Sequence, residues 1–519
     1  MSMARDITTI GGGTLISRLL AYLRDAWIAA LLGAGLYSEA FFAVMQVVNF
    51  FRRLLSEGAL NSAFVPIYLK LRRGEDGAAN ADRFTWRILL VMLCIGGVIA
   101  LLIVFFAPGV ITVVAPGFDR ERRSLAAFLL FMVAPYIVLV GPVAVIAAAL
   151  SAERRVGAVA ISTIMFNLVM VIVLALVILP NHENEEFYAT SWLAFAASGA
   201  GLIQLVLMAG VWLAGGKRWQ HAAERAPDQT IAFFRRTLPG LVASGIPQLK
   251  LIAATAIASA SPAAVSWLYY ANRLYELPLG IAAVTIAAVI VPRIAASVHA
   301  GDRAALAAAQ SRAYEISAGL ALPAATGFAL LAEQIASGLF EHGAFGPRDT
   351  AAVAGALTAI CLGLPGHVLE KVFGAVSFAH EDTHTPMLAA LIGLSTAIVG
   401  GILLFPRFGH VGVAAAIAIS GWVGASVLNL ILRRRGWLSL DAEARQRLPR
   451  IVLATIVMAC AVALAAHAIS TAEPVSSFGR LVVLAGLVML GVAVYLGALQ
   501  VLGVAKLKEL AAAAARHGA

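Results

Sequence analysis

Apolar runs of about 20 residues follow one another along almost the entire chain, and short polar segments separate them. A helix of that length can cross the hydrocarbon core of a bilayer, since each residue adds about 1.5 Å. The pattern therefore predicts an all-α polytopic membrane protein with about fourteen transmembrane helices. The predicted spans are 8–32, 38–69, 84–107, 124–150, 156–180, 188–214, 233–259, 264–294, 309–340, 350–379, 385–405, 410–432, 449–470 and 479–504.

Lys and Arg are distributed unevenly among the loops between these spans. The termini and the even-numbered loops carry most of them, whereas the odd-numbered loops carry Arg120, Arg122, Arg123, Arg348, Arg407 and Arg480. Cytoplasmic loops are enriched in basic residues, so both termini are predicted to be cytoplasmic. Two loops fit this assignment poorly. Asp119–Arg123 is basic but assigned to the outside, and His380–His384 is assigned to the inside without any Lys or Arg.

The composition agrees with a membrane protein. Hydrophobic residues make up 61% of the 519 residues and charged residues 13%, against about 25% charged residues in a soluble protein. The net charge of +10 lies mostly in short loops, where it sets topology, so nucleic acid is not expected as a partner. Cys94, Cys361 and Cys460 lie in apolar runs without metal-ligand spacing, and no metal site is predicted.

The sequence carries no motif of an enzyme. It contains no P-loop, no H-E-x-x-H and no nucleophile elbow, and it has no room for a large soluble catalytic domain. We therefore expect a membrane transporter without catalytic residues or a cofactor. Because a nucleotide site is missing from the sequence, the energy for transport is expected to come from the membrane potential or from an ion gradient.

The first two predicted helices carry many charges although they are otherwise apolar. The charged residues between positions 16 and 66 are Arg18, Arg24, Asp25, Glu39, Arg52, Arg53 and Glu57. Charges at membrane depth are costly, and they usually face the interior of a helix bundle or a water-filled cavity. This segment is therefore the first candidate for a functional site.

Further polar residues lie in the seventh and eighth predicted helices. Arg273 and Glu276 are one turn apart on the eighth helix. Gln248 and Lys250 lie on the seventh helix, where the Gly245–Pro247 segment is a candidate break that would turn backbone groups toward a cavity. A helix turns about 200° over two residues, so Gln248 and Lys250 point in nearly opposite directions unless the helix is broken.

Two interpretations of Lys250 are open. In the first, Lys250 joins the cavity and balances charge there, for example opposite Glu57. In the second, it points between helices and is deprotonated by burial. We favour the cavity, because ionisable residues within a membrane usually face water or a partner.

Arginine dominates this set of intramembrane charges. Its planar guanidinium stays charged and binds phosphate through two parallel hydrogen bonds. A cavity with several arginines and fewer carboxylates suits an anionic substrate, especially a phosphate or a diphosphate. The alternative is a set of structural ion pairs, namely Arg24–Asp25, Arg53–Glu57 and Arg273–Glu276. We favour the binding site because the number of charges exceeds what structural pairing requires.

Five stretches of the chain carry a specific combination of motifs. They are S-R-L-L-A-Y-L-R-D-A at 17–26, G-A-G-x-x-S-E-A-F-F at 33–42, N-F-F-R-R-L-L-S-E-G-A-L-N-S-A-F-V-P at 49–66, A-P-G-F at 115–118 and W-L-Y-Y-A-N-R-L-Y-E-L-P-L-G at 267–280. In these stretches the chain resembles the MurJ, or MviN, family of the MOP exporter superfamily, whose members are bacterial lipid II flippases. The resemblance covers essentially the full chain.

The resemblance implies a role in peptidoglycan and cell-wall biogenesis. A member of this family carries lipid II, an undecaprenyl-diphosphate-linked disaccharide peptide, from the inner to the outer leaflet of the bacterial cytoplasmic (inner) membrane by alternating access. It also implies contacts with membrane lipids and with proteins of cell-wall synthesis or division.

The resemblance further implies a domain organisation. Two six-helix lobes would surround a central cationic cavity, and the last two helices would form a groove for the polyprenyl tail. The implied segments are an N-lobe at 1–216, a cytoplasmic linker at 217–236, a C-lobe at 237–435, and helices 13 and 14 with the C-terminal tail at 436–519.

Site residues are transferred from the family position by position. The essential arginines of the family fall on Arg18, Arg24, Arg52 and Arg273, which would bind the diphosphate. The supporting residues that we predict are Ser17, Asp25, Glu39, Asn49, Glu57, Asn167, Gln248 and Lys250. Three positions depart from the family pattern. Glu39 stands where Asp is common, Asn272 stands where an Asp commonly precedes the arginine, and Lys250 adds a cation.

Other functions fit parts of the pattern. A flippase for another polyprenyl-diphosphate-linked saccharide would need the same cationic site. A drug–cation antiporter would present carboxylates to its substrate, a membrane glycosyltransferase would need a catalytic carboxylate or metal in a large loop, and a scaffold would not need buried arginines. We therefore favour a lipid II flippase, with the related glycolipid flippase as the alternative.

Cysteine labelling tests the predicted topology in a variant whose native cysteines have been replaced. A cysteine at residue 184, in the acidic loop at 181–186, should react with a membrane-impermeant reagent from outside, because this loop is assigned to the periplasm. A cysteine at residue 222, in the basic segment at 217–236, should stay unlabelled in intact cells. The reverse labelling would contradict the fourteen-span topology.

Overall fold

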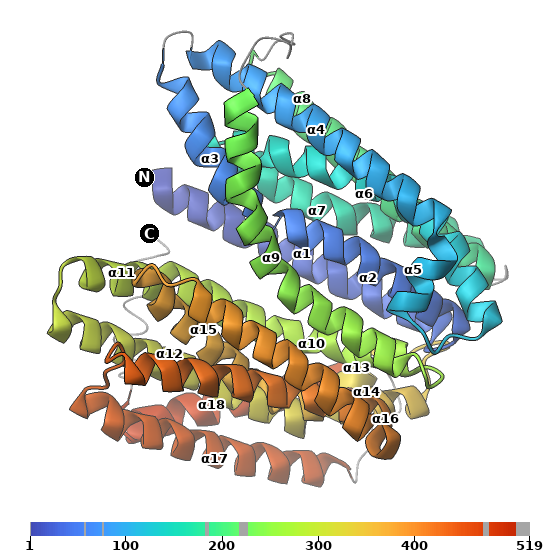
Figure 1. The fold of residues 1–519 in the computed structure, drawn as a ribbon. Coiled ribbons are helices and arrows are strands. Elements are labelled where there is room, and N and C mark those ends of the chain that lie inside the picture. Colours follow the sequence, from blue (N-terminus) through green and yellow to red (C-terminus); the bar gives the residue numbers. More distant parts are fainter. Residues whose placement is uncertain are drawn as a thin grey trace. The chain divides into compact units, whose positions relative to one another are not determined.

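The computed structural model describes residues 2–56, 59–74, 77–181, 186–216, 227–470 and 477–504, which form helices joined by short turns (Figure 1). These described residues include no strand, and the prediction of an all-α protein is confirmed. By their contacts the helices form two compact units, Met1–Ser266 and Trp267–Ala519.

The first unit is built around one long helix, α6. Its helices are α1 (Ser2–Leu32), α2 (Leu36–Ser56), α3 (Ala59–Arg72), α4 (Gly77–Phe105), α5 (Ala107–Val114), α6 (Arg120–Ala152), α7 (Val156–Val173), α8 (Glu186–Leu213) and α9 (Pro227–Ala258). α6 packs against α2, α4 and α8, and α1 packs against α7. α6 is apolar around most of its circumference, which suits a helix covered on several sides.

The A-P-G-F motif forms the turn between α5 and α6. A Cβ atom on Gly117 would lie 2.4 Å from the backbone nitrogen of Ala260, so only glycine fits there. The Gly117 amide donates a hydrogen bond to Ser259 Oγ at 2.9 Å. Asp119 then caps α6 by accepting a hydrogen bond from the Arg122 amide at 2.8 Å. The motif therefore fixes the start of α6 against the end of α9.

α9 belongs to the first unit by its contacts, since it packs against α2 and α3. Phe233 near its start is buried, and its ring meets the rings of Phe64 and Phe84 edge to face. The helix is continuous through Gly245–Pro247, so the predicted break is wrong. A long packed helix tolerates the loss of the one backbone hydrogen bond that proline removes. The division into lobes at residues 216 and 237 stays a prediction.

The second unit contains the remaining helices. They are α10 (Ala264–Thr285), α11 (Val291–His299), α12 (Arg303–Leu330), α13 (Ala332–Phe340), α14 (Pro347–Cys361), α15 (Leu364–Ala379), α16 (His384–Arg434), α17 (Ala442–Ser470) and α18 (Ser477–Val501), with a π-helical turn at Ile286–Ile290 between α10 and α11. α15 packs along α16, α12 packs against α17, and α17 packs against α18.

α16 is two helices joined without a loop. Gly409 interrupts its helical backbone with φ 54° and ψ −139°, a left-handed conformation that glycine adopts readily. A Cβ on Gly412 would lie 2.7 Å from the Leu404 carbonyl oxygen, and one on Gly400 would lie 3.2 Å from the Ala416 Cβ. The two halves therefore fold back on each other, as expected for separate spans at 385–405 and 410–432.

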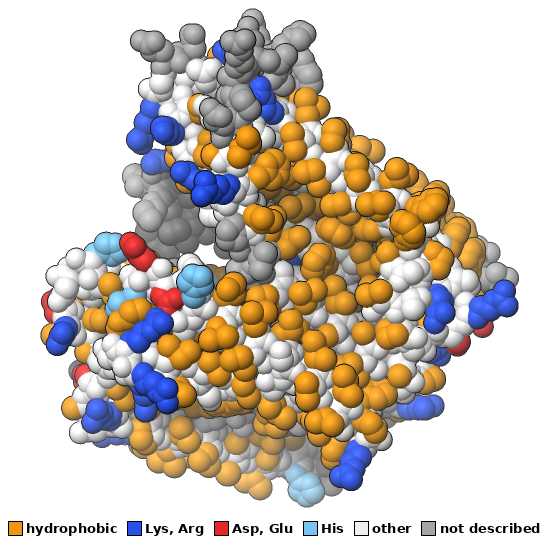
Figure 2. Space-filling model, viewed as in Figure 1, with side chains coloured by type: hydrophobic (Ala, Val, Ile, Leu, Met, Phe, Trp, Pro, Cys, Tyr) orange, Lys and Arg blue, Asp and Glu red, His pale blue; other side chains and the backbone are white. Residues whose placement is uncertain are grey.

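The helices confirm a multi-pass membrane protein. Within the described segments, nine helical runs are long and apolar enough to cross a membrane, or ten if α12 and α13, which meet at 71°, form one bent span. α16 counts once in that number although Gly409 divides it. The total of fourteen spans stays a prediction. Apolar side chains cover the flanks of the helices, and Lys and Arg gather near helix ends (Figure 2).

The turn between α15 and α16 explains one loop that fitted the topology poorly. Asp382 forms an ion pair with Arg435, which follows α16. The Arg435 guanidinium lies 4.8 Å from the centre of the Trp437 ring, and that ring stacks on His380 with centroids 4.1 Å apart. The turn at His380–His384, which has no Lys or Arg, therefore lies beside the basic segment that follows α16, at the same end of the second unit. A single arginine from that segment supplies its positive charge.

Asp382 also holds the start of α16. It accepts hydrogen bonds from the amides of His384 and Thr385 at 3.0 and 3.1 Å. Partial burial alone would raise the pKa of Asp382, but hydrogen bonds from Thr385 and the pairing with Arg435 outweigh burial and lower the pKa to about 2.

Asp382→Ala is expected to lower the free energy of unfolding by about 1 kcal/mol, the usual cost of a lost helix-capping acceptor. The folded pKa lies below the reference value of 3.8, so the carboxylate stabilises the fold fully above that pH and less as the pH falls toward about 2. Thermal unfolding in detergent should show a difference between wild type and variant that is larger near neutral pH than at about pH 3. Glu443→Ala, which removes a more exposed carboxylate, should have a smaller effect. An Asp382→Ala variant as stable as wild type at neutral pH would contradict this role.

Candidate functional site

Arg24 and Asp25 form a buried ion pair on α1. Asp25 Oδ1 accepts from Arg24 Nη2 at 2.6 Å and from Arg24 Nε at 2.9 Å. Arg24 is 6% exposed and Asp25 is fully buried. Each charge therefore compensates the other inside the apolar bundle. This ion pair, which the sequence offered as a structural alternative to a binding site, holds Arg24 in one orientation.

Asn167 of α7 connects this ion pair to the rest of α1. Its side-chain oxygen accepts from Arg24 Nη1 at 2.9 Å, and its amide nitrogen donates to the backbone oxygen and Oγ of Ser17, both at 3.1 Å. Ser17 Oγ in turn donates to the Thr163 carbonyl at 3.1 Å. The structure therefore brings together four predicted residues, Ser17, Arg24, Asp25 and Asn167. One polar network links α1 to α7 across an otherwise apolar contact.

Arg52 is positioned by its own helix. Its Nε and Nη2 atoms donate to Asn49 Oδ1 at 3.3 and 3.1 Å on α2. This contact with a neutral acceptor of the same helix orients the guanidinium. Arg18 is half-buried on α1, six residues before Arg24. Glu57, a predicted supporting residue, lies outside the described residues.

Glu39 lies in a different environment from the arginines of α1. It is fully buried in the first turn of α2, where Oε2 is 3.4 Å from Arg122 Nε. Its Oε1 accepts from the Val265 amide at 3.3 Å, at the start of α10, where a carboxylate is favoured by the helix dipole. Next to it, Ser38 Oγ and Ser266 Oγ are 3.0 Å apart.

The contact with Arg122 explains the second loop that fitted the topology poorly. Arg122 pairs with Glu39, and Arg123 Nη2 donates to the Phe118 carbonyl at 3.0 Å. These two arginines of the Asp119–Arg123 turn hold local structure, so they do not report topology. Arg122 is a residue that sequence reasoning missed, because its partner lies far away in the chain.

Arg273 of α10 pairs with Glu276 one turn later. Arg273 Nη1 is 3.4 Å from Glu276 Oε2, and Asn272 Nδ2 donates to Glu276 Oε1 at 3.4 Å. About a quarter of each side chain of the ion pair is exposed, at 23% and 24%. The pairing is longer and more exposed than that of Arg24 with Asp25, which are 2.6 Å apart and buried. Glu276 thus gives Arg273 a carboxylate partner, which Asn272 does not provide at the position where the family commonly has Asp.

Because α9 is unbroken, the side chains of Gln248 and Lys250 lie on different faces of the helix. Gln248 is buried and Lys250 is half-buried on α9. The role of Lys250 stays a prediction.

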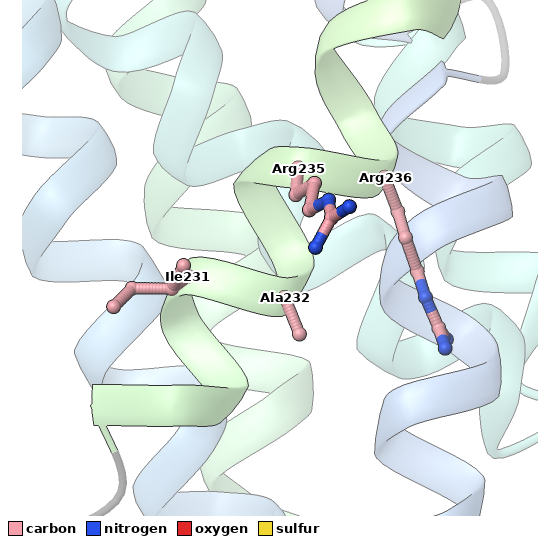
Figure 3. A pocket seen from close by; sticks show the side chains of 4 residues that line it. All are labelled: Ile231, Ala232, Arg235 and Arg236. Atoms are coloured by element: carbon pink, nitrogen blue, oxygen red, sulfur yellow. The ribbon is translucent and has the colours of Figure 1, made fainter.

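A hollow of about 550 Å³ lies near the start of α9 (Figure 3). Arg235, Arg236, Ile231 and Ala232 line it, and both arginines are exposed. These two arginines belong to the basic segment at 217–236, whose positive charge we expect to keep it on the cytoplasmic side. Among the described residues no group of His, Cys, Asp and Glu is arranged to hold a metal ion.

Comparisons with known proteins agree with this geometry. A model of the family described as lipid II flippase MurJ matches residues 28–484. The "probable lipid II flippase MurJ" of Rhizobium meliloti (strain 1021) is 34% identical over 507 residues, covering 95% of this chain and 93% of that protein. A solved structure of "lipid II flippase MurJ, inward closed conformation" matches with a TM-score of 0.78 and 22% identity, covering 95% of this chain and 98% of that chain.

The fold is shared more widely. A multidrug resistance transporter of the MATE family in the MOP superfamily, solved in an inward-facing conformation, matches with a TM-score of 0.68 and 15% identity, covering 83% of this chain and 98% of that chain. The family model and the curated relatives define a membrane transporter, not an enzyme, and the structural matches show that it shares its fold with transporters of the MOP superfamily. The chain belongs to the lipid II flippase MurJ family, and the resemblance seen in its motifs is confirmed.

Asn167→Ala tests the network between α1 and α7. The substitution removes the acceptor of Arg24 and the donor to Ser17, so we expect stability to fall by about 1–2 kcal/mol. Asn49→Ala is the matched control, since its contact stays within one helix and should matter less. Thermal unfolding of both variants in detergent measures the difference. Equal stability of Asn167→Ala and wild type would show that the network does not hold these helices together.

Proposed function

We propose that this chain moves lipid II from the inner to the outer leaflet of the bacterial cytoplasmic membrane by alternating access. Its family and the names of its relatives support this substrate. The observation that carries the proposal is the buried guanidinium of Arg24, held inside the helix bundle by Asp25 and Asn167. An apolar bundle retains such a charge when it serves a function.

The proposed role of the arginines is to bind the diphosphate of the substrate. Arg18, Arg24, Arg52 and Arg273 provide planar donors that match phosphate oxygens two at a time. The carboxylates nearby already contact arginines, because Asp25 binds Arg24 and Glu276 binds Arg273. An anionic diphosphate can take the place of such a carboxylate at a guanidinium, whereas a cation cannot. This favours an anionic substrate over the cations that drug antiporters carry.

The energy for transport is proposed to come from the membrane potential or an ion gradient. Moving one elementary charge across 100 mV is worth about 2.3 kcal/mol. An anionic headgroup that leaves the negative inner side moves in the favourable direction. We propose that the protein lies in the inner membrane with both termini in the cytoplasm, where it contacts membrane lipids and proteins of cell-wall synthesis or division.

A flippase for another polyprenyl-diphosphate-linked saccharide is the alternative. The diphosphate is common to both substrates, so the arginines serve either one. The family match favours lipid II.

Arg→Ala substitutions at Arg18, Arg24, Arg52 and Arg273 test the site in a host depleted of its own copy of the protein. Each should abolish growth and leave lipid II in the inner leaflet, because one lost charged hydrogen-bond pair costs about 1.5–3 kcal/mol of binding. Arg→Lys should rescue partly, since an ammonium lacks the planar fork. A leaflet-specific assay of lipid II gives the readout.

Arg434→Ala is the control for this series. Arg434 is exposed at the end of α16, and its variant should behave as wild type. All variants must be shown to be expressed and inserted. Full function of the four Ala variants would refute the arginine site. Normal lipid II distribution during depletion, with another saccharide lipid trapped inside, would favour the alternative substrate.

A further inference from the structure

The hollow near the start of α9 contains two adjacent arginines that the sequence did not single out as site residues. Arg235 and Arg236 line it together with Ile231 and Ala232, and its volume is about 550 Å³. Small-molecule sites usually enclose about 300–1,000 Å³. The hollow is therefore large enough for a ligand that carries more than one phosphate group.

The rotation of α9 is set by aromatic packing inside the first unit. Phe233 is fully buried, and its ring meets the rings of Phe64 of α3 and Phe84 of α4, both at 6.2 Å between centroids. Thr237, one turn later, is also buried, and its hydroxyl donates to the Phe233 carbonyl at 2.8 Å. A helix turns about 100° per residue, so Arg235 lies about 200° from Phe233, away from this core. The packing therefore keeps the arginine exposed in a defined place.

Apolar side chains accompany the two arginines. Ala232 lies one turn before Arg236 and Ile231 lies one turn before Arg235, so each arginine shares a helix face with one of them. Figure 3 shows both arginine side chains extending from α9, with the short side chain of Ala232 near them. Ile231 is 65% exposed, and Leu238 is 63% exposed. Guanidinium groups beside exposed apolar side chains suit a lipid headgroup, where charge adjoins hydrocarbon.

Other arginines at this end of the first unit contact a carboxylate. Residues near the ends of α3 and α6 pack in or against the same buried cluster as Phe233, so these helix ends lie near the start of α9. There Glu153 pairs with Arg72 at 3.4 Å and with Arg155 at 4.0 Å. Among the described residues that line the hollow, by contrast, the two arginines carry the only charges. The hollow therefore presents positive charge to a ligand.

The expected location of the hollow suits the uptake of substrate. The predicted topology assigns the basic segment at 217–236, and with it Arg235 and Arg236, to the cytoplasmic side. In the function proposed above, lipid II is taken up from the inner leaflet, which faces that side. Exposed positive charge attracts an anionic headgroup and raises its rate of association. Two adjacent guanidinium groups also match the two phosphoryl groups of a diphosphate.

We propose that Arg235 and Arg236 form an entry site that binds the diphosphate of the polyprenyl-linked substrate at the surface of the inner leaflet. This inference rests on the function proposed above. The entry site is distinct from the network around Arg24, which is 6% exposed on α1. Exposed ion contacts are individually weak, so the entry site collects the substrate and releases it again.

Protection of a cysteine in the hollow tests the entry site. Ala232→Cys is introduced into the full-length protein after its native cysteines have been replaced, and the protein is placed in phosphatidylcholine nanodiscs. Lipid II should slow the reaction of this cysteine with a soluble thiol reagent severalfold, because a bound headgroup occupies the hollow. With Arg235→Gln and Arg236→Gln added, the concentration of lipid II for half-protection should rise by about threefold to tenfold.

The matched control removes two charges from the same end of the first unit. Lys70 and Arg73, at the end of α3, are exposed and do not line the hollow. Lys70→Gln with Arg73→Gln should leave the protection at residue 232 as in the parent protein. Arg235→Lys with Arg236→Lys keeps the charge of the segment and loses the planar forks, so half-protection should need more lipid II. This pair keeps the test decisive if the Gln pair does not insert.

Two further ligands distinguish the possible sources of the phosphate. Inorganic diphosphate should protect only at a higher concentration than lipid II, because it has no lipid chain to contact Ile231 and Leu238. Phosphatidylglycerol, which has one phosphate, should protect less than lipid II at the same mole fraction. Equal protection by phosphatidylglycerol would show a general site for anionic lipids and would overturn the assignment to the diphosphate.

The remaining outcomes separate this inference from the flippase function. Arg24→Ala should keep the protection at residue 232, since Arg24 is not part of the entry site. Lipid II that binds the parent protein without protecting residue 232, or that protects the Gln pair at the parent concentration, would overturn the entry site alone. A parent protein that does not bind lipid II at all would overturn the proposed function and the entry site with it.

Discussion

Charge inside an apolar bundle must be compensated locally, and this constraint shapes the structure. Asp25 compensates Arg24, and Asn167 completes the hydrogen bonding of the guanidinium from another helix. Removing one partner of such a buried pair leaves an uncompensated charge, which is far more costly than the pair is worth. The contact between α1 and α7 therefore depends on polar residues, and the arginine is held ready at a fixed place.

The other carboxylates play two different parts. Glu39 and Asp382 lie at helix starts, where each also pairs with an arginine from elsewhere in its own unit, Arg122 and Arg435 respectively. Each of these two carboxylates joins a helix start to another part of its unit, and this contact needs no ligand. Glu276, by contrast, pairs with Arg273 at 3.4 Å, and about a quarter of each side chain is exposed. A transporter needs both kinds, because its units must stay intact while its binding residues change partners.

Sequence patterns predicted the class of protein and its all-α fold, and they offered the Arg24–Asp25 pair as a structural alternative, because these depend on local composition and on neighbours along one helix. The partners of Asn167 and Glu39 could not be predicted, since they come from helices distant in the chain. The continuity of α9 through Pro247 was predicted wrongly for the same reason, as tertiary packing decides whether a proline breaks a helix. The binding of a diphosphate by Arg18, Arg24, Arg52 and Arg273 stays a prediction.

Gly409 gives α16 a property that concerns access. The chain reverses direction there through one left-handed residue, and the two halves of the hairpin touch from Leu404 and Gly412 onward. Residues inserted beside Gly409 would separate Leu404 from Gly412, so this turn is expected to tolerate insertions poorly.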